Sequence, residues 1–323
     1  MEEYHLSNDQ LQVRFIRQGA CLTYLGKDYN YLLRYHNLSD YQTNDLYLST
    51  IVGRNAGRTS PCYYVDHLGK QVALDANEGS DVHLHGGHQS MKLALWDLVE
   101  LTPTEAKLSL TDQASECYAP MTFTLTYRLE GNRLITTIEG YADEPTVVNL
   151  TNHAFFNLNE SKADPITNHW LRLAPAQLQL FNQSGVATGE LDAMLTSPYK
   201  VYNCTQPTRI ESMMKAENPM AERTGGGLDF AYLFQENTDM EPKVELFSAD
   251  HQRGIRIFSN QESCVIYTMN QTNGEIINDG IQAEPYAGIT FEMQRLPNYL
   301  HHFDTDVPRL ESDYLYQVTY EII

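Results

Sequence analysis

The sequence predicts an all-β protein built from antiparallel sheets. Apolar and polar residues alternate with a period of two, most strictly from Met121 to Leu129 and from Tyr314 to Ile322. Such alternation is typical of strands that bury one face and expose the other. Helical periodicity is scarce, and its best example, from Thr208 to Arg223, runs into three glycines, a helix stop signal. Many short strands without helices between them favour a sandwich or a barrel over a parallel α/β fold.

Shorter stretches of the same alternation predict further strands along the chain. They are expected at Leu11 to Phe15, Lys107 to Leu110, Leu171 to Ala174 and Gly254 to Phe258. No stretch rich in Pro, Ser or Gly separates two parts of the sequence, and the strand pattern continues on both sides of its midpoint. Large β-sandwiches form single domains of about 200–250 residues or more. We therefore expect one domain over residues 1–323.

The charge balance of the chain is strongly acidic. Its 323 residues include 22 Lys+Arg and 42 Asp+Glu, a formal net charge of −20. Nucleic acids and anionic membranes attract basic surfaces, and no window of this sequence carries a Lys/Arg run. The composition therefore argues against both as partners, and favours a neutral or cationic substrate over a polyanion. A hydrophobic content of 42% excludes wholesale disorder.

The cysteines give no sign of a disulfide framework or a zinc ribbon. There are five, widely spaced, with no Cys-x-x-Cys pair. Idle thiols in a reducing compartment are the simplest interpretation. The first residues are acidic and polar rather than basic and apolar, and no apolar run approaches the ~20 residues that span a bilayer. These features together predict a cytoplasmic protein.

Two segments combine ionisable side chains with glycines. Residues 53–58 carry two arginines on a tight backbone, where Arg58 can meet vicinal hydroxyls or a carboxylate, although a surface turn explains the segment equally well. In residues 81–88, His83 and His85 are two apart and would share a face of a strand. The histidines here could bind a metal, serve as hydrogen-bonding or acid–base groups, or simply be exposed. A metal is the weaker choice, because no carboxylate stands at a diagnostic spacing.

A third segment, residues 148–158, places one histidine among amides and aromatic rings. His153 is expected to titrate near neutrality and can act as a general acid or base. Asn149 and Asn152 can orient its imidazole or bind hydroxyls, and we expect Asn152 to contact the substrate. A core histidine satisfied by a neighbouring amide is the alternative.

A fourth segment, residues 287–298, carries a carboxylate inside an apolar strand pattern. Glu292 lies between Phe291 and Met293. Burial would raise the pKa of this carboxyl and suit it to act as a base. A glutamate paired with an arginine on a sheet face would have the same local sequence.

In this order, the motifs resemble those of the aldose 1-epimerase family, also called galactose mutarotases. Each motif is modestly specific by itself, but their order along nearly the whole chain is strongly specific. The matching motifs are Gly-Arg-x-Ala-x-Arg at 53–58, Leu-His-Gly-Gly at 84–87, Asn-Leu-Thr-Asn-His at 149–153, Thr-Gly-Glu at 188–190, Gly-Leu-Asp at 227–229 and Phe-Glu-x-Gln…Pro-Asn at 291–298.

This resemblance implies a fold, an activity and a set of site residues. The fold would be a large antiparallel β supersandwich in one domain. The activity would be that of an isomerase that interconverts the α and β anomers of a free aldose. By resemblance Glu292 is the general base, His153 the general acid, and His85 assists near the ring oxygen. Arg58 and Asp229 would bind sugar hydroxyls.

The residue types suit that chemistry. Anomer exchange removes a proton from the C1 hydroxyl and adds one to the ring oxygen, so that the ring opens, the C1–C2 bond rotates and the ring closes on its other face. One acid and one base suffice, with neither metal nor redox cofactor. The expected partner is a small sugar, either glucose, galactose or a reducing disaccharide, and the expected state is a monomer or homodimer.

Three positions depart from the family pattern. Gly57 stands where an asparagine usually precedes the sugar-binding arginine, Val265 where many members have glutamine, and Phe230 where histidine is common. The acid–base set is intact while the hydroxyl-binding set is thinned. These changes predict a sugar bound through fewer contacts, or a larger one such as a reducing disaccharide.

Three other functions are open to the same residues. A hexose-6-phosphate 1-epimerase would need a basic pocket for its anionic substrate, which the net charge opposes. A glycoside hydrolase could pair Asp229 with Glu292, at a separation set by its stereochemistry. A non-catalytic sugar-binding protein is favoured by the departures at Gly57 and Val265, but it would need no acid–base pair.

Overall fold

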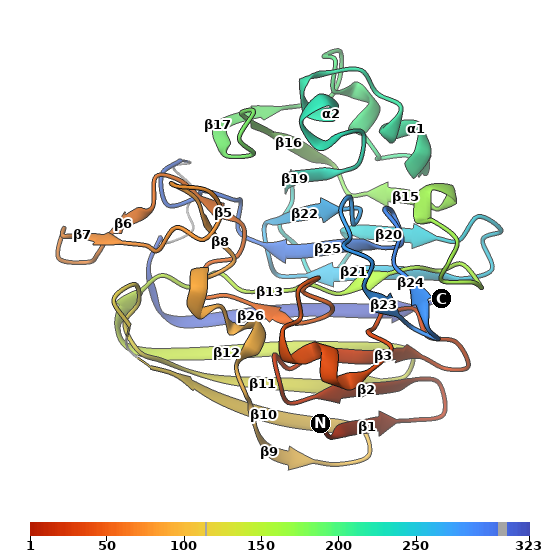
Figure 1. Ribbon diagram of the computed structural model, residues 1–323, viewed down its shortest axis with the longest axis horizontal. Coiled ribbons are helices and arrows are strands. Elements are labelled where there is room, and N and C mark those ends of the chain that lie inside the picture. The colour runs from red at the N-terminus through yellow and green to blue at the C-terminus, as the bar shows by residue number, and fades with distance from the viewer. Residues whose placement is uncertain (114, 303–308) are drawn as a thin grey trace.

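Two antiparallel sheets enclose the main core in the computed structural model, which describes residues 1–113, 115–302 and 309–323. In Figure 1 the half of the nine-stranded sheet that runs from β26 (Glu311–Ile322) to β9 (Asp97–Leu101) lies below the six-stranded sheet. The nine-stranded sheet has the order β18 (Thr208–Arg209), β15 (Trp170–Leu173), β20 (Val244–Phe247), β21 (Gly254–Ser259), β26 (Glu311–Ile322), β12 (Arg133–Thr146), β11 (Met121–Glu130), β10 (Glu105–Asp112) and β9 (Asp97–Leu101). The six-stranded sheet has the order β14 (Phe155–Phe156), β25 (Ile289–Gln294), β22 (Ser263–Tyr267), β19 (Asp229–Phe234), β16 (Ala176–Phe181) and β17 (Ala187–Asp192).

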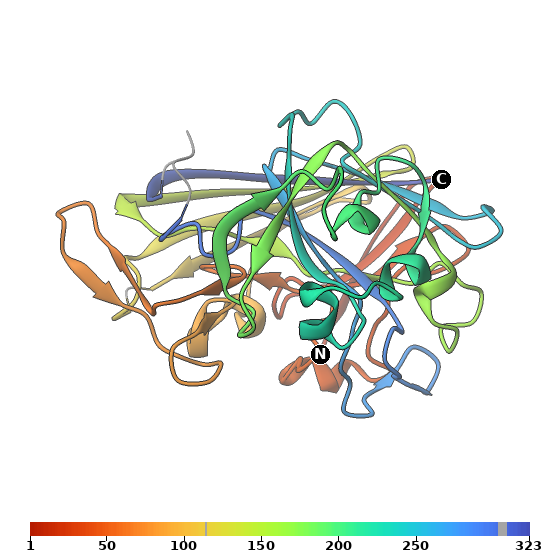
Figure 2. The ribbon, with the colours of Figure 1, turned by 90° about the horizontal axis from the view of Figure 1, so that it is seen from above.

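Smaller sheets complete the fold. A three-stranded sheet near the N-terminus consists of β1 (Glu3–Ser7), β2 (Gln12–Ile16) and β3 (Leu22–Gly26). The two-stranded pairs are β4 (Ile51–Val52) with β13 (Thr151–Asn152), β5 (Arg58–Thr59) with β8 (His83–Leu84), β6 (Tyr63–Val65) with β7 (Gln71–Ala73), and β23 (Ile276–Ile277) with β24 (Ile281–Gln282). Seen from above in Figure 2, the orange hairpin of β6 and β7 projects from one side of the molecule.

The predicted all-β architecture is confirmed, and so are the predicted strands. Every predicted stretch overlaps a strand of the structure: β2, β10, β11, β15, β21 or β26. In β26 the alternation is visible in the burial itself, since Tyr314, Tyr316, Val318 and Tyr320 are buried in the main core. This core draws residues from both ends of the chain, from Leu6 to Tyr320. That residues 1–323 act as one domain stays a prediction.

The single helix predicted from Thr208 to Arg223 is wrong. The structure has a short strand at its start and then two short helices, α1 (Ile210–Met214) and α2 (Pro219–Thr224). Pro219 lacks a backbone N–H and cannot continue a helix, but it suits the first turn of a new one. The Asn218 side chain caps that new helix by accepting from the backbone N–H of Met220 and Ala221. The predicted stop at Gly225 is confirmed, because this residue ends α2 with a positive φ of 67°.

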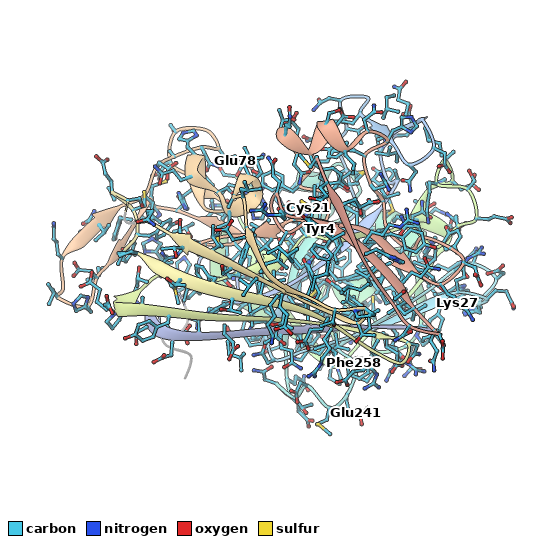
Figure 3. All side chains as sticks on the ribbon, turned by 90° about the horizontal axis from the view of Figure 1, so that it is seen from below. Tyr4, Cys21, Lys27, Glu78, Glu241 and Phe258 are labelled. Carbon is cyan, nitrogen blue, oxygen red and sulfur yellow. The ribbon has the colours of Figure 1, made fainter. Side chains whose placement is uncertain are left out.

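Short 3-10 helices occupy several connections. They are η1 (Leu38–Gln42), η2 (Gly87–Gln89), η3 (Met91–Leu93), η4 (Ile166–Asn168) and η5 (Lys200–Tyr202). No helix among the described residues is long and apolar enough to cross a membrane. All five cysteines are free; Cys21, labelled in Figure 3, is fully buried, and burial raises the pKa of its thiol to about 12. The prediction of idle thiols agrees with these observations.

The register of the six-stranded sheet divides its residues between the core and the opposite face. Successive side chains of a strand point to opposite faces. Phe230, Ile266 and Phe291 therefore enter the main core. Their neighbours on the other face include Asp229 on β19 and Glu292 on β25. A buried sheet thus presents ionisable groups on the face turned away from the main core.

Candidate active site

A cleft of about 440 Å³ lies on this second face of the six-stranded sheet. Its floor carries Glu292 and Asp229, and loops from the first half of the chain bring His85 and His153 to it. Aromatic rings frame the histidines: the Tyr47 centroid lies 5.7 Å from that of His153. The acidic, basic and imidazole side chains that line the cleft are Asp45, Arg58, Glu78, His85, His153, Arg223, Asp229 and Glu292.

His153 and Glu292 form a buried pair in this cleft. The Nε2 atom of His153 lies 3.4 Å from Oε1 of Glu292, and the side chains are only 6% and 4% exposed. His153 comes directly after β13, where its backbone N–H donates to the carbonyl of Thr50. The predicted burial of Glu292 on a strand is confirmed. The Phe155 ring, 5.0 Å from the imidazole centroid, adds an apolar wall.

Burial shifts the pKa of each partner away from its ordinary value. Removal from water, followed by the negative charge of Asp229, raises the pKa of the Glu292 carboxyl to about 8. Burial also lowers the pKa of the His153 imidazole to about 4, so the expectation that it titrates near neutrality is wrong. Between these values the pair holds one proton, and their order places it on Glu292 when no sugar is bound. Transfer of that proton across the 3.4 Å contact gives a carboxylate and an imidazolium with the same total charge.

His85 is a hydrogen-bond donor toward the cleft. Its Nδ1 atom accepts from the backbone N–H of Gly57 at 3.2 Å. Burial lowers the pKa of this imidazole well below its ordinary value, so the ring is neutral and carries its hydrogen on Nε2. Donor atoms of His85, His153 and Glu292 lie within 4.8 Å of one another, a spacing that a metal could bridge. A metal ligand needs a free lone pair, and the Nε2 atom of His85 has none while it carries the hydrogen.

Arg58 and Asp229 lie together in the cleft, as expected. Arg58 donates from Nε to Oε2 of Glu78 at 2.6 Å, and from Nη1 to Oδ2 of Asp229 at 3.4 Å. Arg223 reaches the same Asp229 oxygen at 3.3 Å from the end of α2. The fork of each arginine is thereby fixed by carboxylates, which leaves a rigid polar wall of alternating charge.

Glu78 and Arg223 are functional candidates that the sequence interpretation missed. Glu78, labelled in Figure 3, comes from the loop between β7 and β8, and Arg223 from α2. Arg58 stands 20 residues before Glu78, and Asp229 stands six residues after Arg223, beyond the glycine turn that ends α2. Neither spacing by itself indicates an ion pair. Only the position of Glu78 just before the histidine-rich segment hinted at a role.

The two arginines of the 53–58 segment lie in different environments. Arg54 is 1% exposed and reaches the carbonyls of Ala119 and Val147 and the carboxylate of Asp112 at 3.3 Å. It holds loops together inside the protein. Arg58, four residues later in the sequence, lines the cleft. Neither is the solvated surface arginine that the local sequence also allowed.

Asn152 does not line the cleft, contrary to our expectation. It is fully buried on β13, next to His153 in sequence. Adjacent residues of an extended backbone point in opposite directions, so a chain that aims His153 at the cleft aims Asn152 away from it. The structure therefore gives Asn152 no direct contact with a substrate.

His83 and His85 diverge, so the prediction that they share a face is wrong. Strand β8 ends at Leu84, and His85 has a positive φ of 53° that turns the chain. His83 is buried, and its Nε2 atom lies 2.6 Å from the hydroxyl oxygen of Tyr118. His88 is exposed. The turn continues through Gly86, where a Cβ would lie 1.9 Å from the Gly53 carbonyl oxygen. Only glycine fits this position of the motif.

Of the three departures, one lies away from the cleft. Phe230 is fully buried in the main core, on the face opposite to its neighbour Asp229. The residue at this position cannot reach the cleft. Gly57 and Val265, in contrast, both border a small side pocket next to Glu292.

This fold and this site together define a carbohydrate isomerase with the galactose mutarotase architecture, and comparison with known proteins agrees. A family model described as aldose 1-epimerase matches residues 2–322. A maltose epimerase from Levilactobacillus brevis is 27% identical over 94% of this chain and 89% of its own length. A galactose mutarotase from Sus scrofa is 24% identical over 94% and 88%. The crystal structure of a GalM/aldose epimerase homologue from C. elegans superposes with a TM-score of 0.88 at 18% identity, covering 100% of this chain and 98% of that one.

The chain belongs to the aldose 1-epimerase family of isomerases. The resemblance drawn from the motifs is thereby confirmed, and with it the antiparallel supersandwich fold.

Proposed function

We propose that this protein interconverts the α and β anomers of a free, uncharged aldose by acid–base opening and closing of the sugar ring. The observation that carries the proposal is the buried contact of 3.4 Å between His153 and Glu292 at the base of a polar cleft. A base and an acid that exchange one proton are what the reaction needs, and they must swap roles between opening and closing.

In the forward direction, Glu292 as carboxylate takes the proton of the C1 hydroxyl. The C1–O5 bond breaks as the C1=O1 bond forms, and His153 as imidazolium gives its proton to O5. The open aldehyde rotates about C1–C2, and ring closure reverses both transfers. The pair ends with the same single proton, so the site is ready for the next sugar.

The remaining residues bind and orient the sugar. His85 offers its Nε2–H as a donor near the ring oxygen, where charge develops as the C1–O5 bond breaks. Arg58 and Asp229, held by Glu78 and Arg223, present donors and acceptors to ring hydroxyls. Both arginines that line the cleft among the described residues are already paired with carboxylates. This supports a neutral sugar over a hexose 6-phosphate.

The contacts also favour epimerisation over hydrolysis. A hydrolase of this site would use Asp229 and Glu292 as its carboxylate pair. Here Glu292 contacts His153, while Asp229 is held by two arginines. A carboxylate fixed by two guanidinium groups is a hydroxyl acceptor rather than a shuttling acid.

The cleft volume suits a monosaccharide or a reducing disaccharide. Ligand sites of about 300–1,000 Å³ hold molecules of drug size, and this cleft measures about 440 Å³. The relatives named maltose epimerase and galactose mutarotase support either size.

Polarimetry on freshly dissolved α-anomers tests the proposal. We expect accelerated decay of optical rotation with at least one of glucose, galactose, xylose and maltose. The Glu292→Gln variant supplies the background, and the uncatalysed rate in buffer sets the baseline. Failure to accelerate any of the four sugars would refute the proposal.

A further inference from the structure

Tyr47 forms a common wall for the two histidines of the cleft. Its ring centroid lies 5.3 Å from that of His85 and 5.7 Å from that of His153, and the two imidazole centroids are 5.6 Å apart. These are contact distances for aromatic rings, so the three rings touch one another. Tyr47 also lines the cleft, although no step of the proposed reaction uses it.

A strained loop, residues 44–49, holds the Tyr47 ring in this place. Residues other than glycine rarely adopt a positive φ, yet Asn44, Tyr47 and Ser49 have values of 42°, 55° and 52°. The Asn44 carbonyl accepts from the N–H of Tyr47 at 2.9 Å, and the N–H of Ser49 donates to the carbonyl of His153 at 3.0 Å. The loop is therefore bound to the same histidine that its ring contacts. Strain of this kind persists where the surrounding structure fixes the backbone, and it often marks a functional site.

The ammonium group of Lys92 lies over the Tyr47 ring. Its Nζ atom is 4.0 Å from the ring centroid, the distance of a cation–π contact. The Lys92 carbonyl accepts from Oγ1 of Thr50 at 3.3 Å, which fixes η3 beside the loop. Lys92 is half-buried and makes no ion pair with any described residue. In a chain with 42 acidic residues, a half-buried cation without a carboxylate partner calls for an explanation.

Other ionisable side chains surround the two imidazoles. They are Asp45 of the loop, Arg58 of β5, Glu78 before β8, His83 of β8, Arg223 of α2, Asp229 of β19, Tyr267 of β22 and Glu292 of β25. The two arginines among them form ion pairs with Glu78 and Asp229. Lys92 is thus the cation near the imidazoles that has no carboxylate within ion-pair distance in the described part of the chain, and Asp45 acts on it only from farther away.

The charge of Lys92 disfavours a second cation beside the same ring. Its distance from the centre of either imidazole is at most about 10 Å, the length of the path through the Tyr47 centroid, and partly buried charges this close are poorly screened by salt. Burial is the main cause of the lowered pKa of both imidazoles, and the Lys92 charge lowers each pKa further. A proton on Nδ1 of His85 would also break the 3.2 Å hydrogen bond that this atom accepts from the N–H of Gly57. Lys92 therefore acts in the direction that preserves this bond.

We propose that Lys92, held over the Tyr47 ring, is a positioning residue for anomer exchange, and that its charge keeps both imidazoles neutral in the free enzyme. His85 then remains a donor through its Nε2–H, and His153 takes its proton from Glu292 rather than from water. This inference rests on the proposed function, which gives the two histidines their roles. Lys92 is not among the described residues that line the cleft, so its effect on a sugar passes through these rings.

The expected size of the effect follows from Coulomb's law. At about 10 Å and an effective dielectric constant of about 20, loss of one charge changes the proton affinity of a group by roughly tenfold. Lys92→Met keeps the length of the side chain and removes its charge. Both imidazoles are then expected to titrate at higher pH, and the acid limb of the kcat/KM profile is expected to move to higher pH with His153.

NMR of the histidine rings between pH 3.5 and 8 measures the two titrations, with signals assigned from His85→Gln and His153→Gln. Lys92→Arg keeps the charge over the ring and is expected to leave both titrations as in the parent protein. Lys92→Gln is a second uncharged variant, which replaces Lys92→Met if that protein does not fold. Lys70→Met removes a charge from the exposed turn between β6 and β7 and is expected to change neither titration.

A double-mutant cycle tests the part that the Tyr47 ring plays. Tyr47→Phe keeps the ring, so the effect of Lys92→Met on the His153 titration is expected to persist in this background. Tyr47→Leu removes the aromatic face that holds the ammonium group, and the effect of Lys92→Met is expected to diminish. An undiminished effect in Tyr47→Leu would overturn the proposal, because the charge would then act without the ring.

The outcomes separate this inference from the proposed function. Ring titrations that move in Lys92→Met, with no sugar turned over by the parent protein, would refute the proposed function and leave the electrostatic action of Lys92 on the imidazoles supported. Ring titrations that stay unchanged in Lys92→Met overturn the inference even if sugars are turned over. A loss of stability without such a change would show that Lys92 is structural, and this result also overturns the inference.

Discussion

The Nε2 atom of His153 lies 3.4 Å from Oε1 of Glu292, and both side chains are almost fully buried. His153 follows a two-stranded pair, and Glu292 stands on the six-stranded sheet. Burial raises the pKa of one group and lowers that of the other, so the two share one proton over a wide pH range. An acid–base reaction that must run in both directions needs such a pair.

The pH dependence of kcat/KM should be bell-shaped. Below about pH 4 both groups are protonated and no base is present; above about pH 8 both have lost their protons and no acid is present. Activity is expected between these limits, with the two apparent values belonging to the pair as a whole. Polarimetric rates from pH 3.5 to 9.5 measure the profile. A flat rate across this range would show that the pair does not carry the proton transfers.

Glu292→Gln should abolish anomer exchange while sugar binding survives. The amide keeps the shape and the hydrogen-bonding capacity of the carboxyl but cannot accept the C1 proton, and loss of a general base costs about 10²–10⁴-fold. Polarimetry measures the rate and calorimetry the binding. Glu236→Gln, the same change on an exposed loop, is the matched control. Undiminished rates in the Glu292 variant would remove this residue from its role.

The same variant should be more stable than the parent protein at alkaline pH. The Glu292 carboxyl has a pKa near 8 when folded against an ordinary 4.5, so the unfolded chain releases its proton first. Its contribution to the free energy of unfolding is intact below pH 4.5 and is lost as the pH rises to 8. Each pKa unit is worth about 1.4 kcal/mol. Urea unfolding should show the advantage of Glu292→Gln growing from pH 5 to 8 and constant beyond; an equal advantage at pH 4 would contradict this linkage.

Arg54→Ala should lower the stability of the protein, whereas Arg58→Ala should weaken the binding of sugar. Loss of Arg54 leaves buried carbonyls and the Asp112 carboxylate without their donor, which should lower the free energy of unfolding by about 3 kcal/mol. Loss of Arg58 should raise KM with a much smaller change in stability. Thermal unfolding and polarimetry on both variants distinguish the roles, and each serves as the other's control. Equal destabilisation by the two changes would contradict the assignment.

Glu78→Gln should weaken sugar binding through Arg58. The change removes the ionic partner that holds the guanidinium fork at 2.6 Å, and a hydrogen bond to a charged group is worth about 1.5–3 kcal/mol. We expect KM to rise by about tenfold with kcat nearly unchanged, since Glu78 touches no reacting atom. Asp81→Asn, in the same loop, is the control. A fall in kcat at constant KM would mean that Glu78 acts on the chemistry instead.

Local pattern was enough for the strands and for the burial of Glu292. The alternation of side chains in 121–129 and 314–322 is a property of neighbouring residues, and each predicted strand is present. The helix from Thr208 failed for an equally local reason, since Pro219 starts a second helix within the predicted one. Motif order then identified His85, His153, Arg58 and Asp229, all of which line the cleft.

The ion pairs of the cleft could not be predicted in this way. Nothing near Glu78 in the sequence points to Arg58, 20 residues earlier. Arg223 and Asp229 are only six residues apart, but they meet because the chain turns after α2 and Asp229 begins β19. The prediction for Asn152 was wrong because its side chain points opposite to that of His153, its neighbour in the chain. Which of the two side chains points into the cleft is fixed by the pairing of β13 with β4.

The sequence by itself determined the sheet architecture, the family and most of the charged and imidazole side chains that line the cleft, because periodicity and motif order are carried by the chain. The tertiary structure alone decided how those residues are tuned and what surrounds them. Burial separates the pKa values of Glu292 and His153, and the pairing of β22 with β25 sets Val265 directly opposite Glu292. Both effects depend on which groups exclude water from one another, and that is a property of packing rather than of sequence order.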